Sequence, residues 1–368
     1  MRIVGILSGL LVLACGGSGS ETGDASSGGT GSTGAAATTG TTATPTSTDA
    51  SSSTSGPSSG EVTTTSTGGS TVATTEGGSE SSTGAALPPE SLAEVVDGEP
   101  EAIRDALMFP EGPVWSPEGY LLFSDIPADT IYRWTEGEGS AVFITPSGNS
   151  NGLAFDAMGR LLAAEHGPRR ISRRVIGEMN ATTVVDSFEG QKLNSPNDLV
   201  LRSDGSIYFT DPPYGIDQNQ QELDFQGVFW IDPQGALTVL ADDFDRPNGL
   251  ALSPDESTLY VDDTAKEHVR RFAVQADGNA FGGEVFVDLK SDLVGDPDGM
   301  TVDEFGDLYV TGGGGVRVVR PDGTILGTIM VPEGATNCTF GDADGRALYI
   351  TAPPRVYRVA MKVKGAAF

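Results

Sequence analysis

The stretch RPNGLALSPDESTLYVDDT, residues 246–264, holds one copy of a unit that recurs six times along the chain. It contains a polar head, Asn248, then an apolar segment, a turn, and a second apolar segment, LYVDDT. Both segments are short and bounded by turn residues, and the second is rich in β-branched and aromatic residues, which is typical of β-strands. The six heads are 39 to 51 residues apart; they are Glu111, Asn151, Asn197, Asn248, Asp298 and Asn337.

Further strand-like segments follow the first two in these units. A third is found in Val269-Arg-Arg-Phe and its counterparts, and a fourth, such as Glu284-Val-Phe-Val, follows in the first five units only. Six four-stranded sheets arranged radially make a six-bladed β-propeller, an all-β fold. Because the sixth unit runs out of chain, we expect its outer strand to come from the N-terminal side, from Leu92-Ala-Glu-Val-Val-Asp, and to close the ring.

The first 90 residues differ in composition from the rest. Residues 1–14 have Arg2 and then a mostly apolar run too short to span a bilayer as a helix, which is typical of a signal peptide. The run ends in Val12-Leu13-Ala14-Cys15, which resembles a bacterial lipobox and predicts lipidation of Cys15; an ordinary secretory signal with a chance cysteine is the alternative. Of residues 16–90, 75 positions, 61 are Ser, Thr, Gly or Ala, so we expect residues 15–90 to be a lipidated cysteine followed by a disordered tether.

These features predict a location in the bacterial cell envelope. Since Gly16 rather than Asp follows the cysteine, the outer membrane is favoured over the inner, with the folded domain in the periplasm or at the surface. The lipid would be the only membrane contact. We expect residues 91–368 to form a single domain and a monomer, because a closed ring leaves no sheet edges for a partner to cover.

Charge narrows the range of partners. Residues 1–90 account for −6 of the formal charge of −29, so residues 91–368 carry −23. Nucleic-acid binding needs clustered lysine and arginine, so nucleic acid is a poor partner. An acidic surface or a cation site fits this balance better.

The six heads are the main functional feature of the sequence. In a propeller the first strand of each blade lines the central channel, so the heads should converge on one axis. Tight turns alone would explain Asn, Asp and Gly there, but not carboxylates in two heads and amides in four. Such a set of hard oxygen ligands suits Ca²⁺ or Mg²⁺, with Ca²⁺ favoured because it tolerates irregular geometry.

The repeat motifs resemble those of the gluconolactonase and regucalcin family. The resemblance covers essentially all of residues 105–362 and rests on five segments, which are EGPVWSPEGYLLFSDI (111–126), LNSPNDLVLRSDGSIYFTDPPYG (193–215), RPNGLALSPDESTLYVDDT (246–264), DPDGMTVDEFGDLYVTGGGGV (296–316) and TNCTFGDADGRALYITA (336–352). The resemblance implies a six-bladed propeller with one catalytic divalent cation in the channel, most often Ca²⁺, although some members accept Zn²⁺, Mg²⁺ or Mn²⁺.

The resemblance also assigns roles to individual residues. It implies metal ligation by Glu111, Asn248 and Asp298, and contact of Asn197 with either the metal or the substrate. Asp298 is in addition the residue that the resemblance assigns as proton donor and acceptor. Regucalcin-type members have an arginine two residues before the SPNDL asparagine to hold a sugar acid, whereas this chain has Ser195 there, so that contact does not transfer.

Other polar residues have less definite roles. Asn151 and Asn337 are expected to line the channel. Asp125, Glu165, Asp211 and Asp263 end the second segments of four units and could contact substrate hydroxyls or support the ligands, but capping of strand ends explains them equally well. His166, which opens an HGPRR loop also seen in gluconolactonases, is a candidate for substrate binding.

The predicted reaction is metal-assisted hydrolysis of a sugar lactone such as glucono-1,5-lactone. The cation would polarise the carbonyl, and Asp298, with Glu111 as the competing base, would take a proton from water and return it to the leaving alkoxide. Another lactonase or a phosphotriesterase-like hydrolase is the alternative among enzymes. A non-catalytic ligand-binding propeller is the alternative outside them, although the two carboxylates speak against it.

Overall fold

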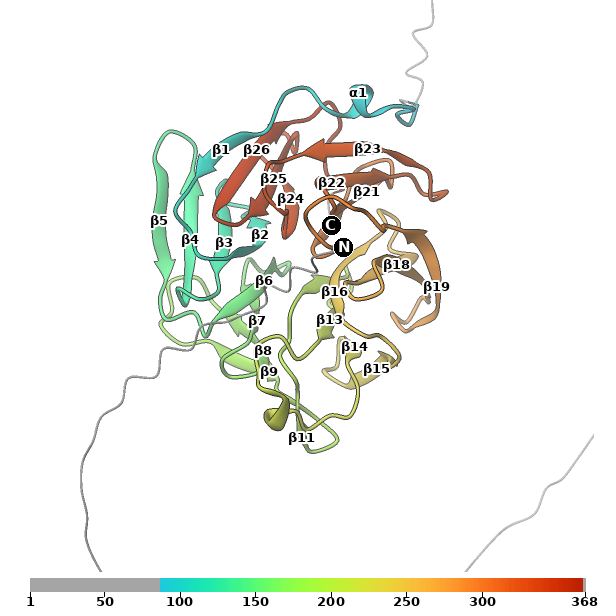
Figure 1. Cartoon of the computed structure of the whole chain (residues 1–368). Coiled ribbons are helices and arrows are strands. Elements are labelled where there is room, and N and C mark those ends of the chain that lie inside the picture. The colour runs from blue at the N-terminus through green and yellow to red at the C-terminus, as the bar shows by residue number, and fades with distance from the viewer. Residues whose placement is uncertain (1–86, 367–368) are drawn as a thin grey trace, which may run out of the picture. The chain divides into compact units, whose positions relative to one another are not determined.

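A computed structural model of the protein describes residues 87–366, and the predictions for the signal peptide, for Cys15 and for most of the tether lie outside this range. In the described part, no helix is long and apolar enough to cross a membrane. The structure consists of six four-stranded antiparallel sheets around a common axis (Figure 1), which confirms the predicted six-bladed β-propeller. Each innermost strand contacts the innermost strands of both neighbouring sheets, so the ring is complete.

The first three blades follow the order of the chain. The first contains β2 (Pro110–Trp115), β3 (Leu121–Asp125), β4 (Thr130–Thr135) and β5 (Gly139–Ile144). The second contains β6 (Ser150–Phe155), β7 (Leu161–Glu165), β8 (Arg170–Arg174) and β9 (Thr182–Val185). The third contains β12 (Leu199–Leu201), β13 (Ile207–Asp211), β14 (Gly227–Ile231) and β15 (Leu237–Ala241). A small hairpin, β10 (Ser187–Phe188) and β11 (Gln191–Lys192), lies between the second and third blades in the chain.

The last three blades complete the circle. The fourth contains β16 (Pro247–Leu252), β17 (Thr258–Asp263), β18 (His268–Val274) and β19 (Ala280–Asp288). The fifth contains β20 (Met300–Val302), β21 (Leu308–Gly312), β22 (Gly315–Val319) and β23 (Ile325–Met330). The sixth contains β24 (Asn337–Gly341), β25 (Ala347–Ala352), β26 (Arg355–Ala360) and β1 (Glu101–Arg104).

The ring is closed from the N-terminal side, as predicted, but by a different segment. The outer strand of the sixth blade is β1, which pairs antiparallel with β26 (cyan beside red in Figure 1). The predicted strand at Leu92 is wrong: Leu92–Val95 form the single helical turn α1. Leu92 and Val95, three residues apart, lie on one face of this turn. Val95 is completely buried in a cluster with side chains of the fifth and sixth blades, and Leu92 packs against Gly327.

Aromatic side chains join neighbouring blades. Trp115 of the first blade stacks on Tyr349 of the sixth, with ring centroids 5.5 Å apart. Tyr309 of the fifth blade meets Phe340 of the sixth edge-on at 4.9 Å. Such contacts add to the burial of large apolar surfaces, so the seam next to the closing strand is held by side chains as well as by β1.

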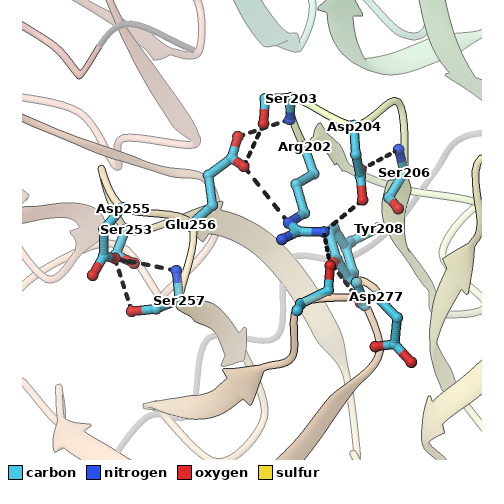
Figure 2. Close-up of polar contacts among 12 residues, drawn as sticks. Arg202, Ser203, Asp204, Ser206, Tyr208, Ser253, Asp255, Glu256, Ser257 and Asp277 are labelled. Carbon is cyan, nitrogen blue, oxygen red and sulfur yellow. Dashed lines mark hydrogen bonds and ion pairs between the residues drawn. The ribbon is translucent and has the colours of Figure 1, made fainter.

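The turns after the innermost strands lie on the face of the propeller opposite the heads, and polar side chains link them. Figure 2 shows Glu256, in the turn between β16 and β17, accepting hydrogen bonds from the amide (2.7 Å) and the hydroxyl (2.6 Å) of Ser203 in the third blade. On the same face the Tyr208 hydroxyl donates to the Gly278 carbonyl at 2.6 Å. The third and fourth blades are therefore joined by polar contacts far from the heads.

Candidate functional site

The heads of the six blades meet at one end of the central channel. Glu111, Asn151, Asn248 and Asn337 lie in β2, β6, β16 and β24, whereas Asn197 and Asp298 lie just before β12 and β20. Antiparallel pairing places the start of each innermost strand beside the end of the second strand, as in the pairs Pro110–Asp125 and Pro247–Asp263. The heads and the ends of the second strands therefore share one face of the propeller.

Side-chain amides link the heads to one another. The Asn151 Nδ2 donates to the Asn197 Oδ1 at 2.7 Å, and the Asn197 Nδ2 donates in turn to the Asn248 Oδ1. On the other side of the ring, the Asn337 Nδ2 donates to the Glu111 Oε2 at 3.2 Å. The structure thus brings together the heads that the sequence predicts to converge.

The two carboxylate heads differ in accessibility. Glu111 is only 2% exposed and accepts the Gly112 amide at 2.9 Å, whereas Asp298 is partly exposed. Although part of its surface is exposed, Asp298 is surrounded by protein, and this desolvation together with the negative charges of Glu111, Asp262 and Asp198 holds its pKa well above the usual range. Burial likewise raises the pKa of Glu111. Asp298 is therefore the more accessible carboxylate of the pair, and its surroundings make it a stronger base than an ordinary aspartate.

Two further buried acids lie near the heads and were missed by the sequence interpretation. Asp198 follows the head Asn197, and its Oδ2 accepts a hydrogen bond from the Asn337 Nδ2 at 3.4 Å across the channel. Burial is the main cause that raises the pKa of Asp198 to about 7. Asp262 is completely buried, and neither of its carboxylate oxygens has a hydrogen-bond partner among residues 87–366. An alignment of the second strands could have found Asp262, because the other five blades have serine, threonine or alanine at its position.

Three of the acids that end the second strands hold the segments leading to the heads. Each accepts two backbone N–H groups, from the residues three and two positions before the head of its own blade. The pairs are Met108 (3.1 Å) and Phe109 (2.9 Å) on Asp125, Asn194 (2.7 Å) and Ser195 (2.8 Å) on Asp211, and Asp245 (2.9 Å) and Arg246 (3.0 Å) on Asp263. We refer to Asp125, Asp211 and Asp263 as the loop-holding aspartates.

The second blade departs from this pattern. Glu165 accepts the Ser172 hydroxyl at 2.5 Å and the Arg170 Nε at 2.7 Å instead. The segment before Asn151 is held by Asp129, whose Oδ1 accepts the Asn149 amide at 2.7 Å. Glu165 therefore bonds to side chains of β8 instead of to the backbone before the head. Asp129 of the first blade holds that backbone segment.

His166 lies beside this ring. Burial lowers its pKa to about 4, while contact with the Asn197 side chain has the opposite effect. Its Nε2 has no hydrogen-bond partner in the described part of the chain. His166 is thus a neutral imidazole at pH 7, next to a predicted ligand.

A cavity of about 820 Å³ extends through the channel behind the heads. Asp198 and Asn337 lie at its inner end, and the apolar side chains of the innermost strands, such as Leu199, Leu250 and Met300, line its walls. The other end of the cavity is lined by further polar side chains, among them Asp156, Arg160 and Arg202. The head end is the candidate active site because the head residues and the buried Asp198 meet there.

The chain is similar to known proteins in sequence and in structure. The family model described as SMP-30/Gluconolactonase/LRE-like region matches residues 109–353. A gluconolactonase from Zymomonas mobilis is 36% identical over 292 residues, which are 72% of this chain and 82% of the relative.

Two solved structures show how far the likeness extends. A gluconolactonase from Xanthomonas campestris superimposes with a TM-score of 0.68 at 36% identity, over 75% of this chain and 94% of its own. A calcium-binding regucalcin from Agrobacterium tumefaciens superimposes with a TM-score of 0.61 over 73% and 95% of the chains, and at 21% identity it shows the shared fold alone. The chain therefore belongs to the SMP-30/gluconolactonase/LRE-like family.

Proposed function

We propose that the protein is a lactone hydrolase that opens a sugar lactone such as glucono-1,5-lactone with the help of a divalent cation, Ca²⁺ being favoured. The observation that carries this proposal is the meeting of Glu111 and Asp298 with amide side chains at one end of the channel. Membership of the family, and the activity named for the relatives from Zymomonas mobilis and Xanthomonas campestris, support the reaction class.

The residues at the head ring fit a divalent cation. Burial raises the pKa values of Glu111, Asp198, Asp262 and Asp298, and negative charges within this group raise those of Glu111, Asp262 and Asp298 further. In the range 87–366, none of the four pairs with a lysine or an arginine. Buried carboxylates without a counter-charge favour binding of a metal ion.

The ligand set would include amides as well as carboxylates. No three Asp, Glu, His or Cys side chains of the described residues lie close enough together to hold a metal on their own. We assign the ligands to Glu111, Asn248 and Asp298, with Asn197 contacting the metal or the substrate. Oxygen-only sets of this kind suit Ca²⁺.

Asp298 is the proposed base of the reaction. A bound cation would polarise the lactone carbonyl and stabilise negative charge on its oxygen. Asp298 accepts a proton from the water that attacks the carbonyl carbon, and it returns that proton to the ring oxygen as the C–O bond breaks, which yields the hydroxy acid. Glu111 is less suited to this role, because it is enclosed and already accepts two hydrogen bonds, from Gly112 and Asn337.

The first test is lactone hydrolysis by the full-length protein before and after EDTA, with Ca²⁺ added back. We expect activity to disappear with the chelator and to return with Ca²⁺. Asp298→Asn should lower kcat by about 10²- to 10⁴-fold, the contribution typical of a general base. Asp322→Asn, in an exposed turn of the fifth blade, is the matched control and should retain activity.

The result that would overturn the proposal is equally definite. If protein that binds Ca²⁺ turns over no lactone, it is not a lactone hydrolase. Turnover of a phosphotriester would then indicate the alternative hydrolase class, and ligand binding that survives Asp298→Asn would indicate a binding propeller.

A further inference from the structure

The connection between β13 and β14 is longer than its counterparts in the other blades. It covers residues 212–226 and contains a short 3₁₀ turn, Gln218–Gln220, whereas the same connection in the other five blades has two to four residues. It lies on the head face, because it follows the loop-holding Asp211. A long segment at this place can contribute side chains to whatever enters the channel.

This segment is anchored next to the head ring. The Gly215 amide donates to the Ser195 hydroxyl at 3.0 Å, and Ser195 is itself held by Asp211. A Cβ atom at Gly215 would lie 2.7 Å from the Cβ of His166, so only glycine allows the segment to approach this closely. The position of the neighbouring Tyr214 is therefore well defined.

The Tyr214 hydroxyl is a buried group without a partner. Its oxygen is shielded from solvent and makes no hydrogen bond with any described residue. Thr264 is nearby, but no hydrogen bond joins its hydroxyl to that of Tyr214; the Thr264 hydroxyl donates to the Pro297 carbonyl at 2.8 Å and accepts from the Asn248 Nδ2 at 3.1 Å. A buried hydroxyl with no partner is costly, so this oxygen is expected to bond to a molecule that the structure does not contain.

The phenol remains a hydrogen-bond donor at neutral pH. Burial raises the pKa of Tyr214 above its usual range, and the negative charges of Asp298 and Asp262 raise it further. The hydroxyl of the nearby Thr264 donates to the carbonyl of Pro297, the residue before the proposed base Asp298. A neutral phenol beside the base can donate to an oxygen atom of a bound substrate without adding charge.

Arg246 supplies a second set of donors at the same place. Its guanidinium lies over the Tyr214 ring, with Cζ 5.4 Å from the ring centroid. Its backbone is fixed by Asp263 at a point two residues before the head Asn248. The side chain is exposed and forms no ion pair with residues 87–366, which leaves its N–H groups available.

We propose that Tyr214 and Arg246 form a substrate-positioning pair that binds hydroxyl oxygens of the lactone, and so selects polyhydroxylated lactones over unsubstituted ones. This inference rests on the proposed function, because it concerns the same site. The pair acts on substrate orientation and affinity, whereas Asp298 acts on the reacting water.

The test compares two lactones that differ in their hydroxyl groups. With the full-length, Ca²⁺-loaded protein, Tyr214→Phe should raise KM for glucono-1,5-lactone about 5- to 30-fold, as expected for one lost hydrogen bond. Its kcat should change less than about threefold. For δ-valerolactone, which lacks hydroxyl groups, kcat/KM should be unchanged. Arg246→Gln should show the same selectivity.

The matched control is Tyr208→Phe. It removes the hydroxyl of Tyr208 (labelled in Figure 2). This hydroxyl donates to the Gly278 carbonyl on the face of the propeller opposite the heads. We expect it to lower stability and to leave both KM values unchanged. Equal effects of Tyr214→Phe on both lactones, or no effect on either, would overturn the positioning pair.

A binding measurement separates this inference from the proposed function. The probe is 1,5-anhydroglucitol, a polyhydroxylated six-membered ring that cannot be hydrolysed, titrated by calorimetry. Weaker binding by Tyr214→Phe than by the wild type, by about 5- to 30-fold, would support the pair even if no lactone were turned over. Equal binding by both proteins would refute the substrate-positioning role of Tyr214 and Arg246, and it would not affect the hydrolase proposal.

Discussion

Asp262 breaks a pattern that most other second strands share. At the corresponding positions the Ser124 hydroxyl donates to the Asn151 carbonyl at 2.8 Å, and the Thr210 hydroxyl donates to the Asn248 carbonyl at 2.7 Å. A carboxylate cannot donate in this way. Burial and the negative charges of Asp198, Asp263 and Glu111 raise the pKa of Asp262 well above its usual range.

The residue scale gives a prediction for stability. Asp262→Thr should increase the free energy of unfolding in EDTA at pH 7 by about 1–3 kcal/mol, because a buried group without a partner is replaced by a hydroxyl that can donate. Urea unfolding measures this change. The reverse substitution, Thr210→Asp, is the control and should destabilise the protein. A less stable Asp262→Thr variant would mean that the acid itself forms a stabilising hydrogen bond.

At the scale of the element, the ends of the second strands position the heads. Asp263, at the end of β17, holds the amides of Asp245 and Arg246, so the start of β16 and its head Asn248 have a fixed place. The same arrangement recurs at Asp125 and Asp211. From the sequence, these aspartates could either cap strand ends or support the ligands. The hydrogen bonds to backbone amides show that they cap the segments that lead to the heads.

Loss of one loop-holding aspartate should therefore weaken the metal site. Asp263→Ala leaves two amides without their acceptor, and we expect Ca²⁺ affinity to fall about 10- to 100-fold, as for other groups that orient metal ligands. Isothermal titration with Ca²⁺ measures this effect. Asp288→Ala, an exposed acid at the end of β19, is the control and should bind Ca²⁺ normally. Unchanged affinity in Asp263→Ala would show that Asn248 keeps its place unaided or is not a ligand.

At the scale of the whole molecule, ring closure concentrates negative charge at the axis. Residues from all six blades contribute to the head ring and its acids, although they are far apart in the chain. Without a cation, the raised pKa values of Asp198, Glu111, Asp262 and Asp298 mean that the folded state holds protons that the unfolded state releases. Stability contributed by these protons is present below a pH of about 4 and is lost as pH rises through the raised values.

The raised pKa values predict a pH dependence of stability that Ca²⁺ reverses. The lowered pKa of His166, about 4, acts in the opposite direction only below a pH of about 6.5. In EDTA, Tm should therefore fall between pH 6.5 and 8.5. Added Ca²⁺ should raise Tm more at pH 8 than at pH 6, because its ligands must lose their protons. Differential scanning calorimetry at pH 6 and at pH 8, each in EDTA and in Ca²⁺, measures these Tm values. An increase of Tm with pH in EDTA, or an equal Ca²⁺ effect at both pH values, would contradict the prediction.

The repeat was sufficient to predict the propeller and the convergence of its heads. A unit with strand-like segments after each polar head cannot bury its apolar faces alone, so six copies pack around an axis. The closing strand was placed wrongly, because Leu92 and Val95 read equally well as strand or helix until the fifth and sixth blades provide the surface that they cover.

Only the tertiary structure decided which acids are buried and which side chains lack a partner. The sequence contains Asp198, Asp262 and Tyr214 next to recognised motifs, but their burial depends on neighbouring blades that lie tens of residues away. Local sequence determines strand formation through side-chain pattern. The pKa of a carboxyl group depends instead on all the groups around it, and so does the absence of a hydrogen-bond partner for a phenol hydroxyl. Ring closure brings those groups together.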